Sequence, residues 1–574
     1  MSTPEPSRSA GHAVVEQLLA LGVRRAYLVP GESFLDVLDG MHGSDLDAVV
    51  CRQEGGAGFM ALAEARLNGG VGVAMVTRGP GAANAAIAVH TAWQDCTPMV
   101  LFVGLIPVAD RGRESFQEFG IEGWFGTTAK EVVVLDDPSR ACTIVRDAVH
   151  LACSGRPGPV VVGLPEDLLR EPCPQPVAAP RALPRGVSVD DVARLTDLVR
   201  AASRPVVVCG GDRFDDRASA DLRRWVETWA LPVLSDFRAQ DKLDHDSPSW
   251  CGPLGYGRSD AAARLLDEAD VVVHLDSVRG DVLSDGYTLG AQGARVILVS
   301  TDPGAHGHEG PVDLHVLASP GSVLAVLAGS AATGAHSRPD TTPPTEPPWR
   351  VWAEAARREH VRWATPRPAP VIEEPVIEAE LAEAPVDLGA VLARLAERMD
   401  PDAVVTYGAG NHAIWAQRFL PHHRCPSLLA PRNGAMGFGV PAAVAAAITQ
   451  PGRQVVTVAG DGCFLMNAQE LAVAAGREAR LLALVVDNAQ YGTIRAHQEA
   501  HHPGRVSGTF LENPDFALLA EGYGGRGWTA RTTEEALAAL DAALLHDGVA
   551  LVHLLVGHDV LAPPGEEATK VAVP

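Results

Sequence analysis

Short apolar runs alternate with stretches of helical periodicity along most of the chain. Apolar runs that alternate with helices predict βαβ units and a largely parallel sheet. We interpret twelve runs as buried strands, at residues 25–29, 46–51, 71–77, 99–104, 159–164, 205–209, 271–275, 294–300, 403–407, 454–459, 481–486 and 550–555. These runs fall into three groups, so we predict three α/β domains, each with a doubly wound parallel sheet.

Two proline-rich segments separate the three groups of strands. We predict that residues 171–186 form a linker and that residues 331–385, which are rich in Pro, Glu and Thr, form an extended connector. The domains then span residues 1–170, 187–330 and 386–574. Several domains are expected, because single hydrophobic cores stop growing at roughly 300 residues.

The formal net charge of the chain is -24 at pH 7. Nucleic-acid affinity depends largely on Lys and Arg side chains that release counterions, so we expect no nucleic-acid partner. A polyanionic ligand needs a local device such as a metal or backbone N–H groups, because the field of the whole chain repels it.

The nine cysteines include no CxxC pair, and we interpret them as reduced and mostly buried side chains. The N-terminal residues do not have the pattern of a secretory signal. No apolar run reaches the ~18 residues that a membrane span needs. We therefore expect a cytoplasmic protein without membrane contact.

Polar residues follow two consecutive predicted strands of the third domain. Gly460, Asp461 and Gly462 come directly after one strand, and Asn488 ends the next. Ligands bind at the carboxyl ends of strands in open parallel sheets. Carboxylate and amide oxygens suit Mg²⁺, and the flanking glycines allow close approach of a phosphate. An ordinary turn beside a strand-end Asn is the alternative for these residues taken singly.

The GDG motif followed after 25 residues by Asn resembles the signature of thiamine diphosphate enzymes, and most closely the acetolactate (acetohydroxyacid) synthase and pyruvate oxidase group. The resemblance implies a pyrimidine-binding, a central and a diphosphate-binding domain, in that order. It also implies that Asp461, Asn488 and the backbone carbonyl near Gln490 bind Mg²⁺. Gly460, Gly462 and Cys463 are then cofactor contacts.

Two further segments of the third domain fit this resemblance. The stretch GAGNH implies that Gly410, Asn411 and His412 contact the diphosphate. The stretch NGAMGFG implies that Met436 bends the cofactor and that the Gly434 carbonyl accepts from its 4'-amino group. Without the resemblance, His412 is a helix cap or a surface residue and Met436 is a core residue.

The first domain supplies the implied catalytic acid. Glu54 follows a predicted strand and opens a helix, where a carboxylate is also favoured by the helix dipole alone. By resemblance, Glu54 hydrogen-bonds N1' of the aminopyrimidine and promotes loss of the C2 proton. Gly79, Gly81 and Asn84, in the stretch RGPGAAN, are implied to line the pyrimidine.

Four residues are implied to lie near the substrate. In the stretch SFQEF, Gln117 is implied to act in catalysis and Phe116 to contact the substrate. Lys130 matches a lysine at the access channel of the synthases, although a solvated lysine is the simpler interpretation. His497 stands where acetohydroxyacid synthases carry a substrate-selecting Trp, so the identity of the acceptor substrate stays open.

The implied activity is decarboxylating carboligation of a 2-oxo acid donor with a carbonyl acceptor. A benzaldehyde-lyase-like carboligase, a sulfoacetaldehyde acetyltransferase, a flavin-dependent 2-oxo acid oxidase and a non-catalytic relative are the alternatives. FAD stays open, because Arg279 matches a flavin-contacting arginine but is equally an ordinary loop residue. Glu54 and Asp461 must reach one cofactor from different domains. In the enzymes that this chain resembles, such residues meet across a subunit interface, so the resemblance implies a homodimer or homotetramer with shared active sites.

Overall fold

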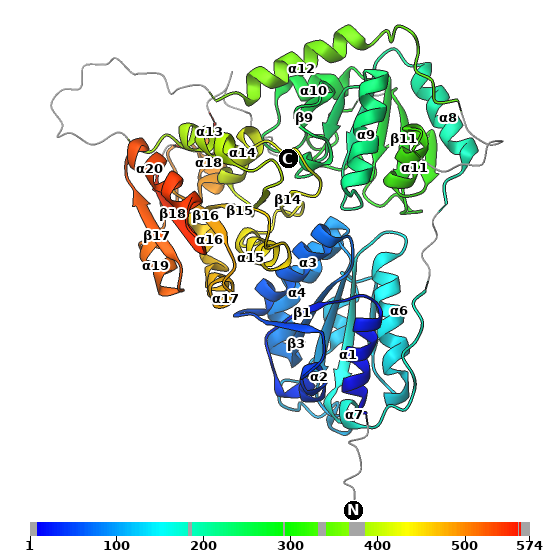
Figure 1. Cartoon of the computed structure of the whole chain (residues 1–574), viewed down its shortest axis with the longest axis vertical. Coiled ribbons are helices and arrows are strands. Elements are labelled where there is room, and N and C mark those ends of the chain that lie inside the picture. The colour runs from blue at the N-terminus through cyan, green and yellow to red at the C-terminus, as the bar shows by residue number, and fades with distance from the viewer. Residues whose placement is uncertain are drawn as a thin grey trace, which may run out of the picture.

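Each of the three predicted domains contains one parallel sheet in the computed structural model (Figure 1). The structure describes residues 8–181, 186–290, 293–330, 340–366, 385–558, 560, 562 and 563. Every sheet has six strands and is flanked by helices. The predicted fold class of three doubly wound α/β domains is confirmed.

The first domain has the strand order β2-β1-β3-β4-β6-β5. Its central strands β4 and β6 are buried along their whole length, which explains their continuous apolar sequences. The elements are α1 (Ala10–Ala20), β1 (Arg25–Leu28), η1 (Glu32–Phe34), α2 (Leu35–Met41), β2 (Asp47–Val50), α3 (Glu54–Asn68), β3 (Gly72–Thr77), α4 (Arg78–Asp95), β4 (Met99–Leu105), η2 (Val108–Asp110), α5 (Ile121–Phe125), β5 (Glu131–Val134), η3 (Pro138–Arg140), α6 (Ala141–Cys153), β6 (Pro159–Pro165) and α7 (Glu166–Arg170).

The central domain has the strand order β12-β11-β10-β7-β8-β9. Its core holds large aromatic side chains, with Trp225, Trp229 and Trp250 almost completely buried. The elements are α8 (Val189–Arg200), β7 (Pro205–Cys209), α9 (Asp216–Trp229), β8 (Val233–Ser235), η4 (Gln240–Lys242), β9 (Trp250–Pro253), α10 (Asp260–Asp267), β10 (Val271–Leu275), β11 (Arg295–Ser300), β12 (Leu314–Leu317) and α11 (Pro320–Leu327), followed by α12 (Arg350–Ala364).

The third domain has the strand order β14-β13-β15-β16-β18-β17. Its alanine-rich helix α15 packs against α3 of the first domain, and Figure 1 shows the two side by side. The elements are α13 (Leu388–Arg398), β13 (Val404–Tyr407), α14 (Asn411–Phe419), β14 (Leu428–Leu429), α15 (Gly439–Thr449), β15 (Val455–Gly460), α16 (Asp461–Leu465), η5 (Ala468–Glu470), α17 (Leu471–Gly476), β16 (Leu481–Asp487), α18 (Gly492–His501), α19 (Phe516–Gly522), β17 (Arg526–Ala530), α20 (Thr533–Leu544) and β18 (Val549–Leu555).

All twelve predicted strands form, with ends that agree with the prediction to within one residue. The six strands that were not predicted are short, and most lie at or next to a sheet edge: β5, β8, β9, β12, β14 and β17. Strand β5 is typical, because its residues are exposed or only half-buried and give a weak apolar signal.

The prediction of an extended connector over residues 331–385 was wrong for its middle part. Helix α12 occupies residues 350–364 and packs against α10 and β9 of the central domain. Its buried residues Ala353 and His360 provide the docking face. Proline bias at both ends of the segment hid a helix-forming stretch rich in Ala, Arg and Glu. Residues 331–339 and 367–384 lie outside the described residues.

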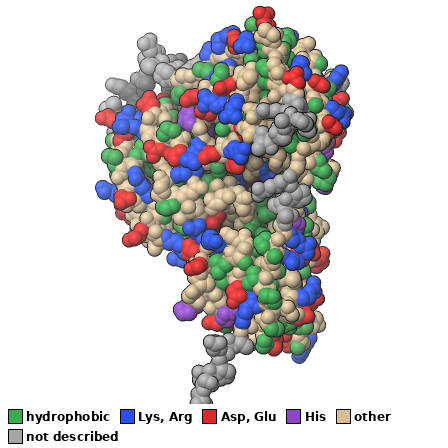
Figure 2. All heavy atoms as spheres, turned by 45° about the vertical axis from the view of Figure 1, so that its right-hand side comes forward, with side chains coloured by type: hydrophobic (Ala, Val, Ile, Leu, Met, Phe, Trp, Pro, Cys, Tyr) green, Lys and Arg blue, Asp and Glu red, His purple; other side chains and the backbone are tan. Residues whose placement is uncertain are grey.

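The surface is mixed in charge. On the face drawn in Figure 2, Lys and Arg side chains intermingle with Asp and Glu. All nine cysteines are free and seven are buried, as predicted. No helix in the described part of the chain is long and apolar enough to cross a membrane.

A buried ion cluster joins the three domains; it consists of Arg66, Asp95, Asp212 and Arg432. Arg66 contacts the carboxylate of Asp95 and, through Nε at 3.1 Å, that of Asp212. Both guanidinium ends of Arg432 lie 3.0 Å from Asp212. Asp95 is fully buried and also accepts the backbone N–H groups of Arg432 (3.0 Å) and Asn433 (2.9 Å). Two cations and two anions therefore balance one another at the junction.

We expect Asp95→Asn to lower the free energy of unfolding by about 3–5 kcal/mol, because it leaves two buried arginines with one carboxylate. Urea unfolding monitored by circular dichroism measures this loss. The control is Asp136→Asn, since Asp136 forms an exposed ion pair with Arg140 on a surface turn. Equal stability of Asp95→Asn and the control would show that the cluster does not hold the domains together.

A second contact between the first and third domains is made by Glu470. This side chain is fully buried and accepts the backbone N–H of Arg52 at 3.2 and 3.1 Å, immediately before α3. A Cβ at Gly56 would lie 2.6 Å from Glu470 Oε1, so the carboxylate sits directly on the first turn of α3. Burial raises the pKa of Glu470 to about 7.

A raised pKa makes the contribution of Glu470 to stability dependent on pH. The group favours the folded state below its unfolded pKa near 4.5, and this contribution is lost as the pH rises towards 7. Relative to Glu470→Gln, the wild-type protein should lose about 3 kcal/mol of stability between pH 4.5 and 8. Urea unfolding of both proteins at a series of pH values measures the difference, and parallel pH profiles would contradict the prediction.

Candidate active site

A cavity of about 240 Å³ lies at the carboxyl edge of the third sheet, and we call it the third-domain cavity. Every diphosphate- and metal-binding residue predicted for this domain lines it: Gly410, Asn411, His412, Gly434, Met436, Gly460, Asp461, Gly462, Cys463, Asn488 and Gln490. Strands β13, β15 and β16 are neighbours in the sheet, so the segments that follow them meet at one edge. The structure therefore brings together segments about 80 residues apart in the sequence.

Asp461 is the first residue of α16 and is almost completely buried. Its Oδ1 accepts the N–H of Gly462 at 2.9 Å, and its Oδ2 accepts the N–H of Gln490 at 3.1 Å. Burial raises the pKa of Asp461 to about 6. A cation beside its oxygens would restore the ionised carboxylate, so the donor set of Asp461 with the oxygens of Asn488 and Gln490 fits Mg²⁺.

Three residues that support Asp461 were missed from the sequence. Asn513 Nδ2 donates to Asp461 Oδ2 and to Asp487 Oδ1, both at 2.8 Å. His553 Nε2 lies 2.8 Å from Asp487 Oδ2. Burial alone would raise the pKa of Asp487, but the hydrogen bonds from His553 and the Ala489 N–H outweigh it and lower that pKa. A histidine inside the apolar strand β18 was the one sequence signal for this network.

Helix N-termini border the cavity on two sides. Helix α14 begins after Gly410 and α18 after Tyr491, and neither N-terminus is capped by a side chain. The free N–H groups of such termini favour a phosphate. His412 Nε2 is buried and has no partner among the described residues. Burial lowers the pKa of His412 to about 3, so the neutral ring can offer an N–H to a phosphate oxygen.

Glycines bring the walls of the cavity close to His412. A Cβ at Gly410 would lie 2.9 Å from His412 Nδ1, and one at Gly460 would lie 2.8 Å from the same atom. Both positions therefore exclude larger residues, since real Cβ atoms do not approach so closely. The diphosphate predicted for this cavity fits the uncapped helix ends, the unpartnered imidazole and the two glycines.

The loop that carries Gly434 and Met436 is held from two sides. Asp95 of the ion cluster accepts its N–H groups at residues 432 and 433. Further on, the Gly437 N–H donates to Cys463 Sγ at 3.2 Å, and its carbonyl accepts Asn467 Nδ2 at 2.9 Å. Gly434 has φ +74°, a conformation that favours glycine. The half-buried Met436 is thereby fixed against the cavity.

Glu54 is the first residue of α3, as expected from the sequence. Its Oε2 accepts Asn84 Nδ2 at 2.8 Å, and a Cβ at Gly81 would lie 3.4 Å from its Oε1. Gly79, Gly81 and Asn84 belong to the first two turns of α4. None of these four residues is among the described residues that line the third-domain cavity.

Gln117 lines a second cavity of about 190 Å³, at the carboxyl edge of the first sheet, which we call the first-domain cavity. Phe116 lies in the same loop and is 75% exposed, which leaves its ring free for contact with another molecule. His497 is half-buried in α18, one turn beyond Thr493, whereas the third-domain cavity is lined only as far as Ile494 along this helix.

Two residues with predicted roles, Lys130 and Arg279, are not among the described residues that line either cavity. Lys130 donates from Nζ to Leu151 O (2.5 Å) and Ser154 O (2.6 Å), so it caps the end of α6. Desolvation lowers its pKa to about 8. Arg279 donates to the backbone carbonyls of Tyr287 and Leu289, at 2.6 and 3.0 Å. The guanidinium therefore holds its own loop, and flavin binding stays an open prediction.

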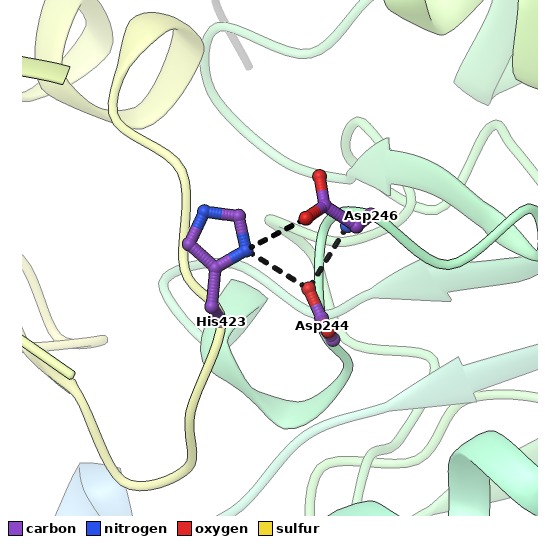
Figure 3. Close-up of side chains that lie close together, drawn as sticks. All are labelled: Asp244, Asp246 and His423. Atoms are coloured by element: carbon purple, nitrogen blue, oxygen red, sulfur yellow. Dashed lines mark hydrogen bonds and ion pairs between the residues drawn. The ribbon is translucent and has the colours of Figure 1, made fainter. Parts of the chain in front are cut away.

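A cluster of metal-ligand types, Asp244, Asp246 and His423, lies outside both cavities (Figure 3). His423 Nδ1 is 3.0 Å from Asp244 Oδ1 and 3.5 Å from Asp246 Oδ2. Arg223 Nη1 already pairs with Asp244 at 2.6 Å. The cluster therefore forms a hydrogen-bonded contact between the central and third domains.

Comparison with known proteins identifies relatives of the whole chain. Sequence models of the thiamine pyrophosphate enzymes match at residues 8–123 (N-terminal TPP binding domain), 192–327 (central domain) and 408–554 (C-terminal TPP binding domain). The acetolactate synthase large subunit of Parasynechococcus marenigrum is 30% identical over 584 residues, covering 99% of this chain and 91% of the relative.

Two further relatives carry similar names. The acetolactate synthase isozyme 2 large subunit of Escherichia coli is 28% identical over 563 residues, covering 96% of this chain and 97% of the relative. The probable acetolactate synthase large subunit of Methanocaldococcus jannaschii is 27% identical over 576 residues, covering 98% and 95%. Together with the cavity at the third sheet, these matches show that the chain belongs to the thiamine pyrophosphate enzyme family and is an acetolactate synthase-like enzyme of that family.

Proposed function

We propose that the protein is a magnesium- and thiamine diphosphate-dependent decarboxylating carboligase, which joins a 2-oxo acid donor to a carbonyl acceptor. The observation that carries this proposal is the third-domain cavity. It places uncapped helix N-termini and an unpartnered imidazole beside a carboxylate whose pKa is raised by burial. This combination suits a diphosphate held through a divalent metal, in a chain whose net charge of -24 repels anions elsewhere.

The residues of the cavity divide into two sets. Asp461 and the oxygens of Asn488 and Gln490 would hold Mg²⁺, while His412 and the N–H groups at the start of α14 would hold the diphosphate. When bound, thiamine diphosphate supplies the nucleophilic carbon and the electron sink for bond cleavage next to a keto group. Met436 would support the cofactor from below, because Cys463, Asn467 and Asp95 fix its loop.

Glu54 would hold the proton that activates the cofactor. Asn84 donates to one oxygen of its carboxylate, and Gly81 leaves space beside the other. The start of α3 is bound to Glu470 of the third domain in the same chain, and Glu54 does not line that chain's cavity among the described residues. We infer that Glu54 acts in the cavity of a second copy, in a homodimer or homotetramer with shared active sites.

The identity of the acceptor substrate distinguishes the proposed activity from the alternative activities predicted from the sequence. A benzaldehyde-lyase-like carboligase, a sulfoacetaldehyde acetyltransferase and a flavin-dependent oxidase use the same scaffold. Product analysis by mass spectrometry after incubation with pyruvate, thiamine diphosphate and Mg²⁺, with and without an aldehyde, tests the proposal. Acetolactate or an acyloin would support it, and no consumption of pyruvate or of longer 2-oxo acids despite cofactor binding would overturn it.

We expect Glu54→Gln to lower kcat by about 10²–10⁴-fold, because the amide cannot hold the activating proton. Cofactor affinity should stay close to the wild-type value, since Glu54 lies outside the diphosphate anchor. Steady-state kinetics and a thiamine diphosphate titration by protein fluorescence measure the two effects. Wild-type turnover in this variant would remove Glu54 from its proposed role.

Asp461→Ala should weaken thiamine diphosphate binding in the presence of Mg²⁺ by about 10–100-fold, because the cation loses its only charged protein ligand. The titration is repeated without the metal, where wild type and variant should become similar. Asp541→Ala is the matched control, since this carboxylate of the same domain pairs only with surface arginines. Metal-dependent affinity that is unchanged in Asp461→Ala would contradict the assignment of the ligand.

A further inference from the structure

A column of aromatic rings lies at the junction between the central domain, α12 and the third domain. We call it the histidine column; it consists of His360 of α12, Trp250 of β9, His245 of the segment before β9, and His422 of the loop between α14 and β14. The ring centroids lie 5.7 Å apart for His360 and Trp250, 4.5 Å for Trp250 and His245, and 5.5 Å for His245 and His422. Imidazoles from three segments of the chain therefore pack in one interface.

Backbone hydrogen bonds beside the column join the loop of the third domain to the central domain. The His245 N–H donates to the His422 carbonyl at 2.9 Å. Asp241 of η4 accepts the backbone N–H groups of Ser427 and Leu428, at 3.0 and 3.1 Å. The loop at residues 420–427 is therefore held against the central domain at both of its ends, with the histidine column between them.

Two imidazoles of the column are buried, and each has a ring nitrogen without a partner. His360 is 5% exposed and His422 is 3% exposed. His422 Nδ1 lies 2.8 Å from Ser427 Oγ, whereas its Nε2 has no partner among the described residues. The same holds for His360 Nδ1, and a Cβ at Gly252 would lie 2.7 Å from it, so the backbone of β9 covers this nitrogen. An imidazolium has two N–H donors, and here the second would find no acceptor.

The charged and titratable groups that face the column do not favour an imidazolium. They belong to Asp241, Lys242, Asp244, Asp246, Arg357, His423 and Arg453, of which Figure 3 shows Asp244, Asp246 and His423. Lys242 Nζ pairs with Asp241 at 2.8 Å, and Arg223 Nη1 pairs with Asp244 at 2.6 Å. Arg357 donates to the carbonyls of two column residues at 2.8 and 3.0 Å, which places a permanent cation beside the rings. The nearest carboxylates are therefore already neutralised.

The packing of the column keeps its imidazoles neutral. Burial lowers the pKa of His360 to about 3 and that of His422 to about 4. Desolvation also lowers the pKa of the half-buried His245. A histidine whose folded pKa is lowered stabilises the folded contact above its unfolded pKa near 6.5, and this contribution is lost as the pH falls towards the folded pKa. The contact is therefore stable at neutral pH and becomes weaker on acidification.

We propose that the histidine column is an acid-sensitive switch, which opens the contact between the central domain and residues 420–427 of the third domain. Below about pH 6 a ring of the column takes up a proton, and its second N–H is satisfied only where water reaches the ring, so the contact opens. The loop continues through β14 towards Met436, and opening removes one support of that segment. The switch is independent of the proposed reaction, because its four rings are not among the described residues that line either cavity.

Hydrogen exchange measured by mass spectrometry between pH 7 and 4.5, corrected for the intrinsic pH dependence of exchange, tests the proposal. The opening constant of peptides that cover β9 and residues 420–428 should rise, while β4 of the first domain stays protected. The rise should be about 100-fold smaller in His360→Phe, because the phenyl ring takes up no proton and each neutral histidine adds about tenfold per pH unit below its unfolded pKa. Equal rises in wild type and variant, or loss of protection of β4 at the same pH, would overturn the proposal.

A second variant, His422→Asn, keeps a polar atom beside Ser427 Oγ and carries no titratable ring. It should also reduce the rise, so the prediction remains measurable if His360→Phe does not fold. The matched control is His546→Phe, since His546 is exposed and its ring lies 6.1 Å from that of Trp528, outside the column. Its exchange profile should equal that of wild type. A reduction as large as that in His360→Phe would contradict the switch, because loss of any histidine would then have the same effect.

Discussion

The pairing of buried charges at the junction of the three domains is the constraint on which the rest of the structure depends. Arg66, Asp95, Asp212 and Arg432 come from all three domains, and none can leave the cluster without exposing an uncompensated charge to a dry interior. Asp95 also holds two backbone N–H groups of the loop that leads to Met436. The same carboxylate therefore fixes both the domain arrangement and one wall of the third-domain cavity.

In the proposed function, the third-domain cavity attracts an anionic cofactor although the chain as a whole is strongly acidic. A net charge of -24 disfavours a polyanion in general, so the attraction has to be local. In the proposed function, helix N-termini, the neutral His412 and a carboxylate suited to Mg²⁺ would provide it within a space of about 240 Å³. Because burial lowers the pKa of His412, its ring would act as a hydrogen-bond donor without adding a charge. The proposed cofactor site thus depends on geometry more than on positive side chains.

Features that depend on the local sequence pattern were predicted from the sequence. Contacts between residues that are far apart in the chain were missed. Central strands were predicted to within one residue, because strands buried on both faces are continuously apolar; β14, with two residues, gave no such signal. Asp461 and Asn488 were expected to be neighbours, since they follow adjacent parallel strands. The contact of Asn513 with Asp461 could not be predicted, because Asn513 lies in a loop after α18, more than 50 residues later in the sequence.

The hydrogen-bond partners of Lys130 could not be predicted for the same physical reason. Its ammonium group donates hydrogen bonds to the end of α6, more than 20 residues later in the sequence. No local sequence pattern predicts such a contact. The resemblance assigned a lysine to this position, whereas the hydrogen-bond partners of its side chain became known only from the structure. Cytoplasmic location and the assembly of subunits stay predictions, because they depend on interactions outside one chain.

The distribution of site residues over two domains gives the assembly a mechanical consequence. Gly79 contacts the loop of Gln117 and Gly81 contacts Glu54, so a single turn of α4 fixes both the first-domain cavity and the proposed acid. Asp95 of the first domain and Cys463 of the third domain hold the loop that carries Met436 against the third-domain cavity. If two copies join these halves, any shift between subunits changes the distance from the third-domain cavity to Glu54 without disturbing either half. Subunit contact, more than folding of either domain, then sets the alignment of the proposed acid with the cofactor.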